Sequence, residues 1–328
     1  MPANLTADYK AAEERYRAAA DLEEKIAALE EMLATVPKHK GTEKIQADIK
    51  AKLAKARKQP AKKSTGHHVD VAYVKKEGAG QVAVLGLANS GKSQLVTRLT
   101  KAECRAAPYP FTTLVPQSGM LEHMDIAIQL VDLPAAGKDS PVPWVPQSAR
   151  MADAGMVVLD LGGADPAVEW REIVGSLEEK KITLVPSRDL VVETPPPART
   201  LPTIVVGSRL DAADARDVLE LLGAEIGPAW TLIGTSAVTG EGCEAVGPAL
   251  WRLLGMVRVY AKLRGKKPET EPFVFRQGET VTGFAEKIHR ELATQFKFAR
   301  VWNEHGTDGL RVPRDYVIQD GDVIEITS

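Results

Sequence analysis

The chain has 328 residues, of which 44% are hydrophobic and 26% are charged. These values are typical of globular proteins, and the length suggests about two or three domains. No apolar run approaches the roughly 18 residues of a membrane span, and the N-terminus lacks the pattern of a secretory signal. The two cysteines, Cys104 and Cys243, are far apart in sequence, which argues against a disulfide framework and fits a cytoplasmic location.

The net charge of −2 conceals an uneven distribution along the chain. Residues 38–63 carry ten basic and two acidic groups, a net charge of +8, whereas residues 64–255 carry 16 basic and 23 acidic groups, a net charge of −7. A basic block of this kind is typical of a nucleic-acid contact, and equally of a helix face that is exposed to solvent. Both interpretations stay open at this point.

The first 60 residues predict a helical hairpin, followed by a linker over residues 61–79. Apolar side chains recur at helical spacing across residues 8–35 and again across residues 42–58. The break between the two helices is short, so we expect them to lie antiparallel. The second helix carries most of the basic block.

Residues 80–255 alternate short apolar runs with amphipathic helices. The expected strands are residues 82–85, 126–131, 156–159, 182–185, 203–206 and 231–233. The expected helices are residues 93–101, 167–180, 213–222 and 244–254. Strands that are apolar on both faces and alternate with helices indicate an α/β fold, with a mostly parallel sheet covered on both sides.

Residues 256–328 have a different pattern, that of a small α+β domain. The expected strands are residues 257–261, 273–275, 299–302 and 322–326, with a helix that runs from residue 282 or 283 to residue 296. A segment of roughly 70 residues is large enough to fold alone.

A phosphate-binding loop is the most specific motif of the chain. Residues 86–93 read GLANSGKS, which fits the pattern G-x-x-x-x-G-K-[ST] between an expected strand and an expected helix. Glycines let backbone N–H groups converge on phosphate oxygens, and the helix N-terminus adds a positive partial charge. Lys92 is expected to reach the β- and γ-phosphates, and Ser93 to offer its hydroxyl to Mg²⁺.

Asp132 follows the apolar run of residues 126–131. A carboxylate at the end of a strand beside such a loop is well placed to hold Mg²⁺, directly or through water.

Residues 109–113, YPFTT, stand about sixteen residues after the phosphate loop, and residues 132–134, DLP, follow later. Together with the loop, these segments resemble the Obg-like and developmentally regulated GTP-binding proteins. The helical hairpin with its AKLAKAR stretch at residues 51–57 is similar to that of the developmentally regulated branch, and residues 256–328 resemble the TGS domain, a small β-grasp module. The resemblance thus implies a P-loop GTPase domain between a helical hairpin and a TGS domain.

The resemblance also implies roles for individual residues. Thr113, or with less support Thr112, stands at the position of the switch I threonine, which senses the γ-phosphate and Mg²⁺. Asp132 stands at the aspartate of the third guanine-nucleotide motif. The nucleotide-binding residues expected in all are Asn89, Ser90, Gly91, Lys92, Ser93, Gln94, Asp132, Ser208, Arg209, Asp211, Ser236 and Ala237. The expected metal ligands are Ser93, Thr113 and Asp132, and the expected catalytic residues are Lys92, Thr113 and Asn89.

Asp211 is the expected reader of the base. Residues 208–211 stand where the family has Asn/Thr-Lys-x-Asp, and residues 235–237 match the fifth motif, whose backbone closes over the base. A carboxylate can accept two hydrogen bonds from N1–H and N2–H of guanine, a pair that adenine does not supply. The alternative is that Asp211 is an N-cap, since residues 212 onward have a helical pattern.

Three departures from the family pattern affect the prediction. Ala135 replaces the glycine of the third motif, and the segment after it is rich in proline, which restricts the backbone of switch II. Ser208 and Arg209 replace the usual residues of the base-reading motif, which lowers the expected affinity for guanine. Most of the helical insert that developmentally regulated proteins carry is absent from residues 161–200.

A second ion is expected from the resemblance. Ala136 follows Ala135 and cannot orient a water molecule, as in family members that hydrolyse GTP without a glutamine. Some relatives use K⁺ held by an asparagine of the phosphate loop, and Asn89 occupies that position. The alternative is that Asn89 only accommodates a tight turn.

The leading hypothesis is a slow cytoplasmic GTPase that requires Mg²⁺, is stimulated by K⁺, and acts with the ribosome, RNA or a translation-linked protein through residues 38–63 and the C-terminal domain. The second is a guanine-nucleotide-binding module that hydrolyses little or nothing and serves as an interaction protein. The third, a P-loop kinase or ATPase, requires Asp211 to be accidental. The C-terminal domain, with a net charge of +1, is also compatible with a protein–protein module.

Overall fold

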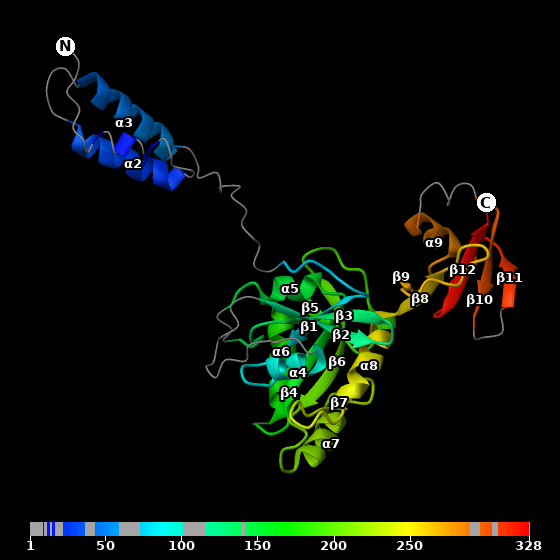
Figure 1. The fold of residues 1–328 in the computed structure, drawn as a ribbon. Helices are drawn as coiled ribbons and strands as arrows, with labels where there is room; N and C mark the ends of the chain where they lie inside the picture. The colour runs from blue at the N-terminus through cyan, green and yellow to red at the C-terminus, as the bar shows by residue number, and fades with distance from the viewer. Residues whose placement is uncertain are drawn as a thin grey trace. The chain divides into compact units, whose positions relative to one another are not determined.

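The computed structural model describes residues 9, 12–13, 15–16, 22–36, 43–58, 73–100, 116–138, 142–163, 165–288, 296–303 and 308–327. The chain divides into two compact units, Met1–Val69 and Asp70–Ser328 (Figure 1).

The N-terminal unit contains the two helices of the predicted hairpin, α2 (Leu22–Thr35) and α3 (Glu43–Lys58). An additional helical segment includes Tyr9 and Ala12, which are buried against both helices. Arg15 and Glu31 form a salt bridge of 2.7 Å. In one continuous helix these residues would be about 24 Å apart, so the prediction of a single helix over residues 8–35 is wrong. The chain reverses between them, which buries a small core that the spacing of α2 alone does not reveal.

The larger unit contains a sheet with the strand order β2-β3-β1-β4-β6-β5, with β7 paired to β6. Its strands are β1 (Gln81–Leu85), β2 (Gln117–His123), β3 (Ile126–Asp132), β4 (Ala154–Asp160), β5 (Ile182–Val185), β6 (Arg199–Ser208) and β7 (Leu232–Gly234). All neighbours run parallel except β2, which is antiparallel to β3. The predicted α/β class and parallel sheet are confirmed. The sequence analysis missed β2, because its sequence QSGMLEH has no sustained apolar run.

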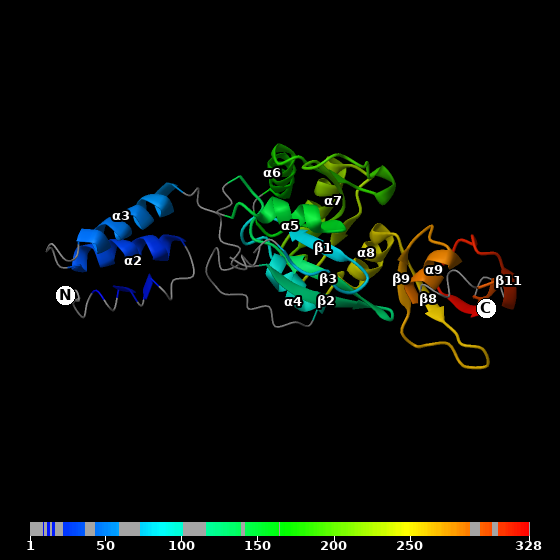
Figure 2. The same cartoon turned by 90° about the horizontal axis from the view of Figure 1, so that it is seen from above.

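Helices cover both faces of this sheet (Figure 2). On one face, Val82 and Val84 of β1 pack with α4 (Lys92–Thr100) and α8 (Val246–Leu254). On the other, Ala83 and Leu85 belong to the core formed with α5 (Val145–Met151), α6 (Pro166–Glu179) and α7 (Ala215–Ile226). Residues 82–85 of β1 thus alternate between two cores, which explains why all four are apolar. Among the described residues between β4 and β6, the only elements are α6, β5 and the short helix η1 (Arg188–Leu190), which agrees with the missing insert.

The C-terminal domain contains a second sheet of five strands, in the order β11-β10-β12-β8-β9. Its elements are β8 (Met256–Ala261), β9 (Phe273–Arg276), α9 (Val281–Ile288), β10 (Phe298–Trp302), β11 (Asp308–Val312) and β12 (Asp322–Thr327). The fully buried Phe284 of α9 packs in the core of this domain. The predicted α+β domain is confirmed, although β11 was missed; residues 289–295 of the predicted helix lie outside the described residues.

The turn between β2 and β3 contacts the C-terminal domain. Arg258 of β8 donates a hydrogen bond of 2.8 Å to Asp125 in this turn and a second one to Asp320 of its own domain. The Tyr260 hydroxyl also donates to Asp125. These contacts attach β8 to the strand pair that carries Asp132 at its opposite end.

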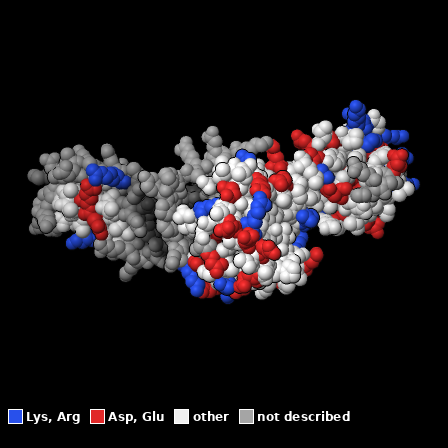
Figure 3. All heavy atoms as spheres, turned by 90° about the horizontal axis from the view of Figure 1, so that it is seen from below, with Lys and Arg blue, Asp and Glu red and all other residues white. Residues whose placement is uncertain are grey.

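Acidic side chains gather on the face of the larger sheet domain seen in Figure 3, with a few lysines and arginines among them. This surface agrees with the net charge of −7 over residues 64–255.

Candidate functional site

The predicted phosphate loop connects the carboxyl end of β1 to the N-terminus of α4. Asn89 and Gly91 adopt left-handed conformations, with φ of 64° and 85°. A Cβ atom at Gly91 would also lie 3.2 Å from the Ser208 hydroxyl, so both conformation and space favour glycine there. Asparagine tolerates the left-handed region better than most residues, which supports the tight-turn interpretation of Asn89 and leaves its role toward K⁺ a prediction.

The cation of the loop is buried. The Lys92 ammonium donates a hydrogen bond of 2.6 Å to the Leu87 carbonyl, and the residue is only 7% exposed. Burial lowers the pKa of Lys92 to about 8, although the charges of Asp132 and Glu169 oppose the shift. Phosphate oxygens would be stronger partners for this ammonium than the single carbonyl.

The predicted metal ligands Ser93 and Asp132 lie together. The Ser93 hydroxyl donates a hydrogen bond of 2.6 Å to Asp132 Oδ2. Asp132 is 1% exposed, and its Oδ1 atom has no partner within the described part of the chain. Burial raises the pKa of this carboxyl, although the hydrogen bond from Ser93 and the charge of Lys92 oppose the shift. A hydroxyl and a carboxylate with a free oxygen are a donor set that fits Mg²⁺.

The base-reading loop after β6 is tied to the phosphate loop by two side chains. The Ser208 hydroxyl donates to the Ser90 carbonyl at 2.7 Å. The Arg209 guanidinium donates to the Asn89 carbonyl at 2.9 Å and also pairs with Asp160 at the end of β4. The substituted residues of this motif therefore hold two consecutive carbonyls of the phosphate loop.

Asp211 lies on this loop with its side chain exposed. It accepts a hydrogen bond from the hydroxyl of Ser236, a fully buried residue of the predicted fifth motif, and Leu210 is bonded to the backbone of Thr235. Helix α7 begins at Ala215 with Asp214 at its N-cap position, so the alternative that Asp211 caps this helix is wrong. Ala237 follows Ser236 and is half-buried.

The start of switch II is held from two sides. The Ala136 N–H donates to the Gly86 carbonyl at 3.1 Å, and the Ala136 carbonyl accepts a hydrogen bond of 2.5 Å from Ser176 of α6. One turn earlier on α6, Glu172 accepts a hydrogen bond from the Lys138 N–H at 3.4 Å. The segment after Asp132 is thus packed between the phosphate loop and α6.

Comparisons with known proteins agree with this geometry. Residues 81–187 match the family described as 50S ribosome-binding GTPase, and residues 257–328 match the TGS domain. An uncharacterized GTP-binding protein of Methanocaldococcus jannaschii is 28% identical in an alignment of 365 positions, gaps included. The alignment covers 93% of this chain and 92% of the relative. Developmentally-regulated GTP-binding protein 2 of Bos taurus is also 28% identical, over 92% of this chain and 98% of its own.

The chain resembles the developmentally regulated GTP-binding proteins along 92% of its length, at 28% identity. The structure of a GTP-binding protein from Pyrococcus horikoshii shares the fold, with a TM-score of 0.50, 16% identity and coverage of 76% of this chain and 99% of that one. The resemblance inferred from the YPFTT segment, the phosphate loop and the C-terminal domain is therefore confirmed.

The predicted site residues of this chain fall into two groups. The phosphate loop, Asp132 and the two base motifs meet at the carboxyl ends of β1, β3, β6 and β7. Gln94 is exposed on α4. Thr112 and Thr113 lie outside the described residues, and their roles stay predictions.

The sequence analysis missed an acidic face of α6. Glu169 accepts a hydrogen bond from the Asp160 N–H at 3.1 Å, and burial raises the pKa of its carboxyl. Glu169, Glu172 and Ser176 are spaced three and four residues apart, so they share one helix face. That spacing, on the helix after the strand that ends at Asp160, was the available signal.

Within the described residues, no helix is both long enough and apolar enough to cross a membrane.

Proposed function

We propose that the protein binds GTP and GDP at the carboxyl edge of the sheet and hydrolyses GTP slowly in a Mg²⁺-dependent reaction. The observation that carries this proposal is the link between the two halves of the site. Ser208 and Arg209 hold the phosphate loop, while Asp211, two residues further on, is exposed for the base. Similarity to relatives that are named GTP-binding proteins supports the same ligand.

The residues divide the work by chemistry. Lys92 would transfer its hydrogen bond from Leu87 to phosphate oxygens, and the N–H groups of Asn89 to Ser93 would surround the β-phosphate. Ser93, Asp132 and Thr113 are the proposed Mg²⁺ ligands. Mg²⁺, when bound, neutralises charge that develops on the phosphate oxygens. Asp211 would accept the two guanine hydrogen bonds, and the Ser236 hydroxyl already fixes its orientation.

A second function is favoured by switch II. Ala135 replaces the family's glycine, and the next residue is hydrogen-bonded to both Gly86 and Ser176. A segment fixed in this way would bind guanine nucleotides without coupling them to movement or hydrolysis, and the protein would act as an interaction module.

The partners and ions are also proposals. We assign K⁺ stimulation to Asn89, and binding of the ribosome, RNA or a translation-linked protein to residues 38–63 and the C-terminal domain, in the cytoplasm. The match to a family described as ribosome-binding GTPases supports a ribosomal partner.

The test measures phosphate release from GTP by the purified protein in KCl and in NaCl, with binding of GTP, GDP and ATP on the same sample. We expect GTP-specific release that increases in KCl. Guanine binding without release would favour the interaction module. Lys92→Ala is the control, since loss of the main cation should abolish nucleotide binding, and an unchanged GTP affinity would contradict the site.

A further inference from the structure

A cluster of cations lies at the edge of the sheet opposite the phosphate loop. It consists of Lys76, Arg188, Arg199 and Arg276, and we call it the arginine cluster. Arg199 is the first residue of β6, whereas the nucleotide site lies beyond its last residue. Strand β1 alone separates the two edges by about 17 Å, so the cluster is separate from the proposed nucleotide site.

One carboxylate, that of Asp153, pairs with two of the four cations. Asp153, just before β4, accepts a hydrogen bond of 2.7 Å from Lys76 and one of 3.0 Å from the Gln81 N–H. Arg276, from β9 of the TGS domain, is 3.7 Å from the same carboxylate. Asp153 therefore joins cations from two domains.

The other two arginines bind backbone carbonyls. Arg188 donates a hydrogen bond of 3.0 Å to Leu254, the last residue of α8, and Arg199 one of 3.2 Å to Ala152, the C-cap of α5. The Nε atom of Arg199 is buried and has no hydrogen-bond partner among the residues described. Capping a helix satisfies one or two of the five N–H groups of a guanidinium, so most of their donor capacity is unused.

The charges of the cluster do not cancel. Arg188 experiences the charges of Arg199 and Arg276 and of one acid, Asp153, and its pKa is lowered by burial and then by these arginines. Four cations, one carboxylate and about half a negative charge from each of two helix C-termini leave roughly +2. Such an excess in a domain that is otherwise acidic has an electrostatic cost, which an anion of matching charge would remove.

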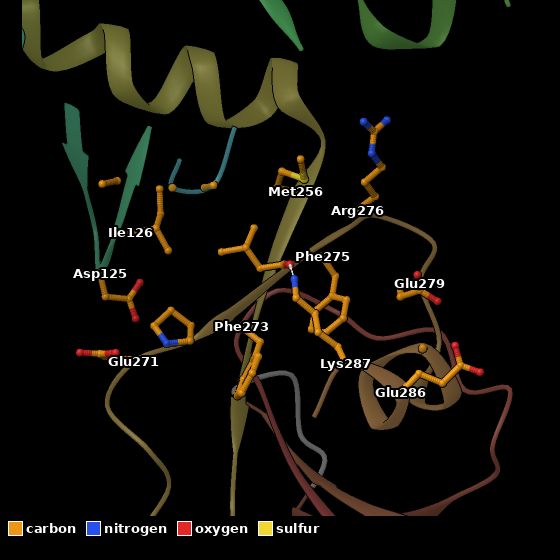
Figure 4. A pocket seen from close by; sticks show the side chains of 16 residues that line it. Asp125, Ile126, Met256, Glu271, Phe273, Phe275, Arg276, Glu279, Glu286 and Lys287 are labelled. Atoms are coloured by element: carbon orange, nitrogen blue, oxygen red, sulfur yellow. Dashed lines mark hydrogen bonds between the residues drawn. The ribbon is translucent and has the colours of Figure 1, made fainter. Parts of the chain in front are cut away.

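Acids of the neighbouring groove do not compensate Arg276. Asp125, Glu271, Glu279 and Glu286 line this groove between the two domains. In Figure 4 the Arg276 guanidinium points away from the carboxylates of Glu279 and Glu286. Its side chain is 60% exposed, so it is accessible to a ligand.

We propose that the arginine cluster binds a phosphate group. A phosphate carries close to two negative charges and several acceptor oxygens, and planar guanidinium groups recognise it with paired hydrogen bonds. The orphan Nε of Arg199 and the free N–H groups of Arg188 and Arg276 supply donors from both domains. The ligand would bridge the GTPase and TGS domains. A free polyphosphate and an RNA both present charged phosphate oxygens, although each RNA phosphodiester carries a single negative charge.

The test titrates inorganic pyrophosphate into the Lys92→Ala protein in phosphate-free buffer, so that the phosphate loop does not contribute. We expect saturable binding that Arg276→Gln and Arg188→Gln each weaken about tenfold. Arg171→Gln is the matched control, because it removes an equal charge from an exposed arginine that pairs with Glu225, and it should leave the affinity unchanged. Arg276→Gln changes an exposed side chain, so its result does not depend on Arg199, whose Nε atom is buried.

A short single-stranded RNA in a second titration identifies the source of the phosphate. Binding of the RNA that Arg276→Gln weakens by the same factor would assign a phosphodiester, and binding of pyrophosphate alone would assign a free polyphosphate. The proposal is overturned if neither binds, if the two cluster variants behave like Arg171→Gln, or if oligo-glutamate binds more tightly than both. It stands or falls independently of GTP binding, which the wild-type protein reports separately.

Discussion

The base-reading loop and switch II both depart from the family pattern, and both contact the phosphate loop, but by different means. The base-reading loop uses the substituted side chains themselves, since Ser208 binds the Ser90 carbonyl and Arg209 the Asn89 carbonyl. Switch II uses its backbone, because the N–H of Ala136 binds Gly86.

This difference indicates that two departures from the family pattern affect the site differently: Ser208 and Arg209 make contacts with the phosphate loop through their side chains, whereas switch II makes its contact through the backbone of Ala136. In the base-reading loop, the Ser208 hydroxyl and the Arg209 guanidinium hold the phosphate loop in place, so the substituted residues still connect the two loops. In switch II, the restraint comes from helix α6, because Ser176 and Glu172 are hydrogen-bonded to the backbone of Ala136 and Lys138. The first loop is therefore expected to bind nucleotide much as its relatives do, and the second to move less.

Asp211→Asn is expected to have the largest effect. It tests whether the base-reading loop still recognises guanine. The carboxylate would accept two hydrogen bonds from guanine, and bonds to a charged group contribute about 1.5–3 kcal/mol each. We expect the ratio of GTP to ATP affinity to fall roughly a hundredfold, as measured by competition binding.

Asp214→Asn is the matched control for that experiment. It removes the same charge from an exposed aspartate three residues along, whose side chain makes no capping hydrogen bond. An unaltered ratio of GTP to ATP affinity in Asp211→Asn would show that the base is recognised elsewhere. The conclusion that the base-reading loop still binds the nucleotide would then be wrong.

The sequence indicated those candidate site residues that a motif names, and it gave no indication of the contacts that only the fold creates. The phosphate loop, Asp132 and Asp211 are each adjacent to a readable strand or pattern. Ser176 and Arg188 are not, because their roles depend on which carbonyl lies opposite them after folding. The prediction of one long N-terminal helix failed for a similar reason, since periodicity does not reveal that Arg15 returns to Glu31.

Lys92 lies between the two loops, and the pH dependence of binding tests its environment. Burial lowers its pKa from the ordinary 10.5 to about 8 in the nucleotide-free protein. Phosphates require the protonated form, so affinity should be constant below the pKa and fall above it. We expect GDP affinity at pH 8.8 to be about sevenfold weaker than at pH 6.5.

The lowered pKa of Lys92 also predicts how the free energy of unfolding changes with pH. Because the folded pKa lies below the unfolded one, the unfolded chain binds more protons between pH 8 and 10.5, and the free energy of unfolding should rise with pH across that window. Lys92→Arg, which stays protonated, should remove this rise. A GDP affinity that is flat to pH 8.8 would mean that Lys92 keeps its ordinary pKa.

Ser176→Ala is expected to give the smallest effect and addresses switch II alone. Its hydroxyl donates to the Ala136 carbonyl, and such a hydrogen bond contributes about 0.5–1.5 kcal/mol. If this contact restrains switch II, its loss should accelerate amide exchange across residues 133–138 and raise GTP hydrolysis about threefold, with GTP affinity unchanged. Ser118→Ala, at an exposed serine of β2, is the control.

Ala135→Gly separates restraint by α6 from stiffness of the loop itself. If the two causes are independent, the gains in hydrolysis of Ser176→Ala and Ala135→Gly should multiply in the double variant. If Ala135→Gly has no effect unless the Ser176 hydroxyl is also removed, the contact with α6 is the main restraint on switch II. Alanine in place of glycine at position 135 would then add no restraint of its own while that contact is present. Exchange at residues 133–138 that stays unchanged in all three variants would contradict a restrained switch II, because then neither contact limits its opening.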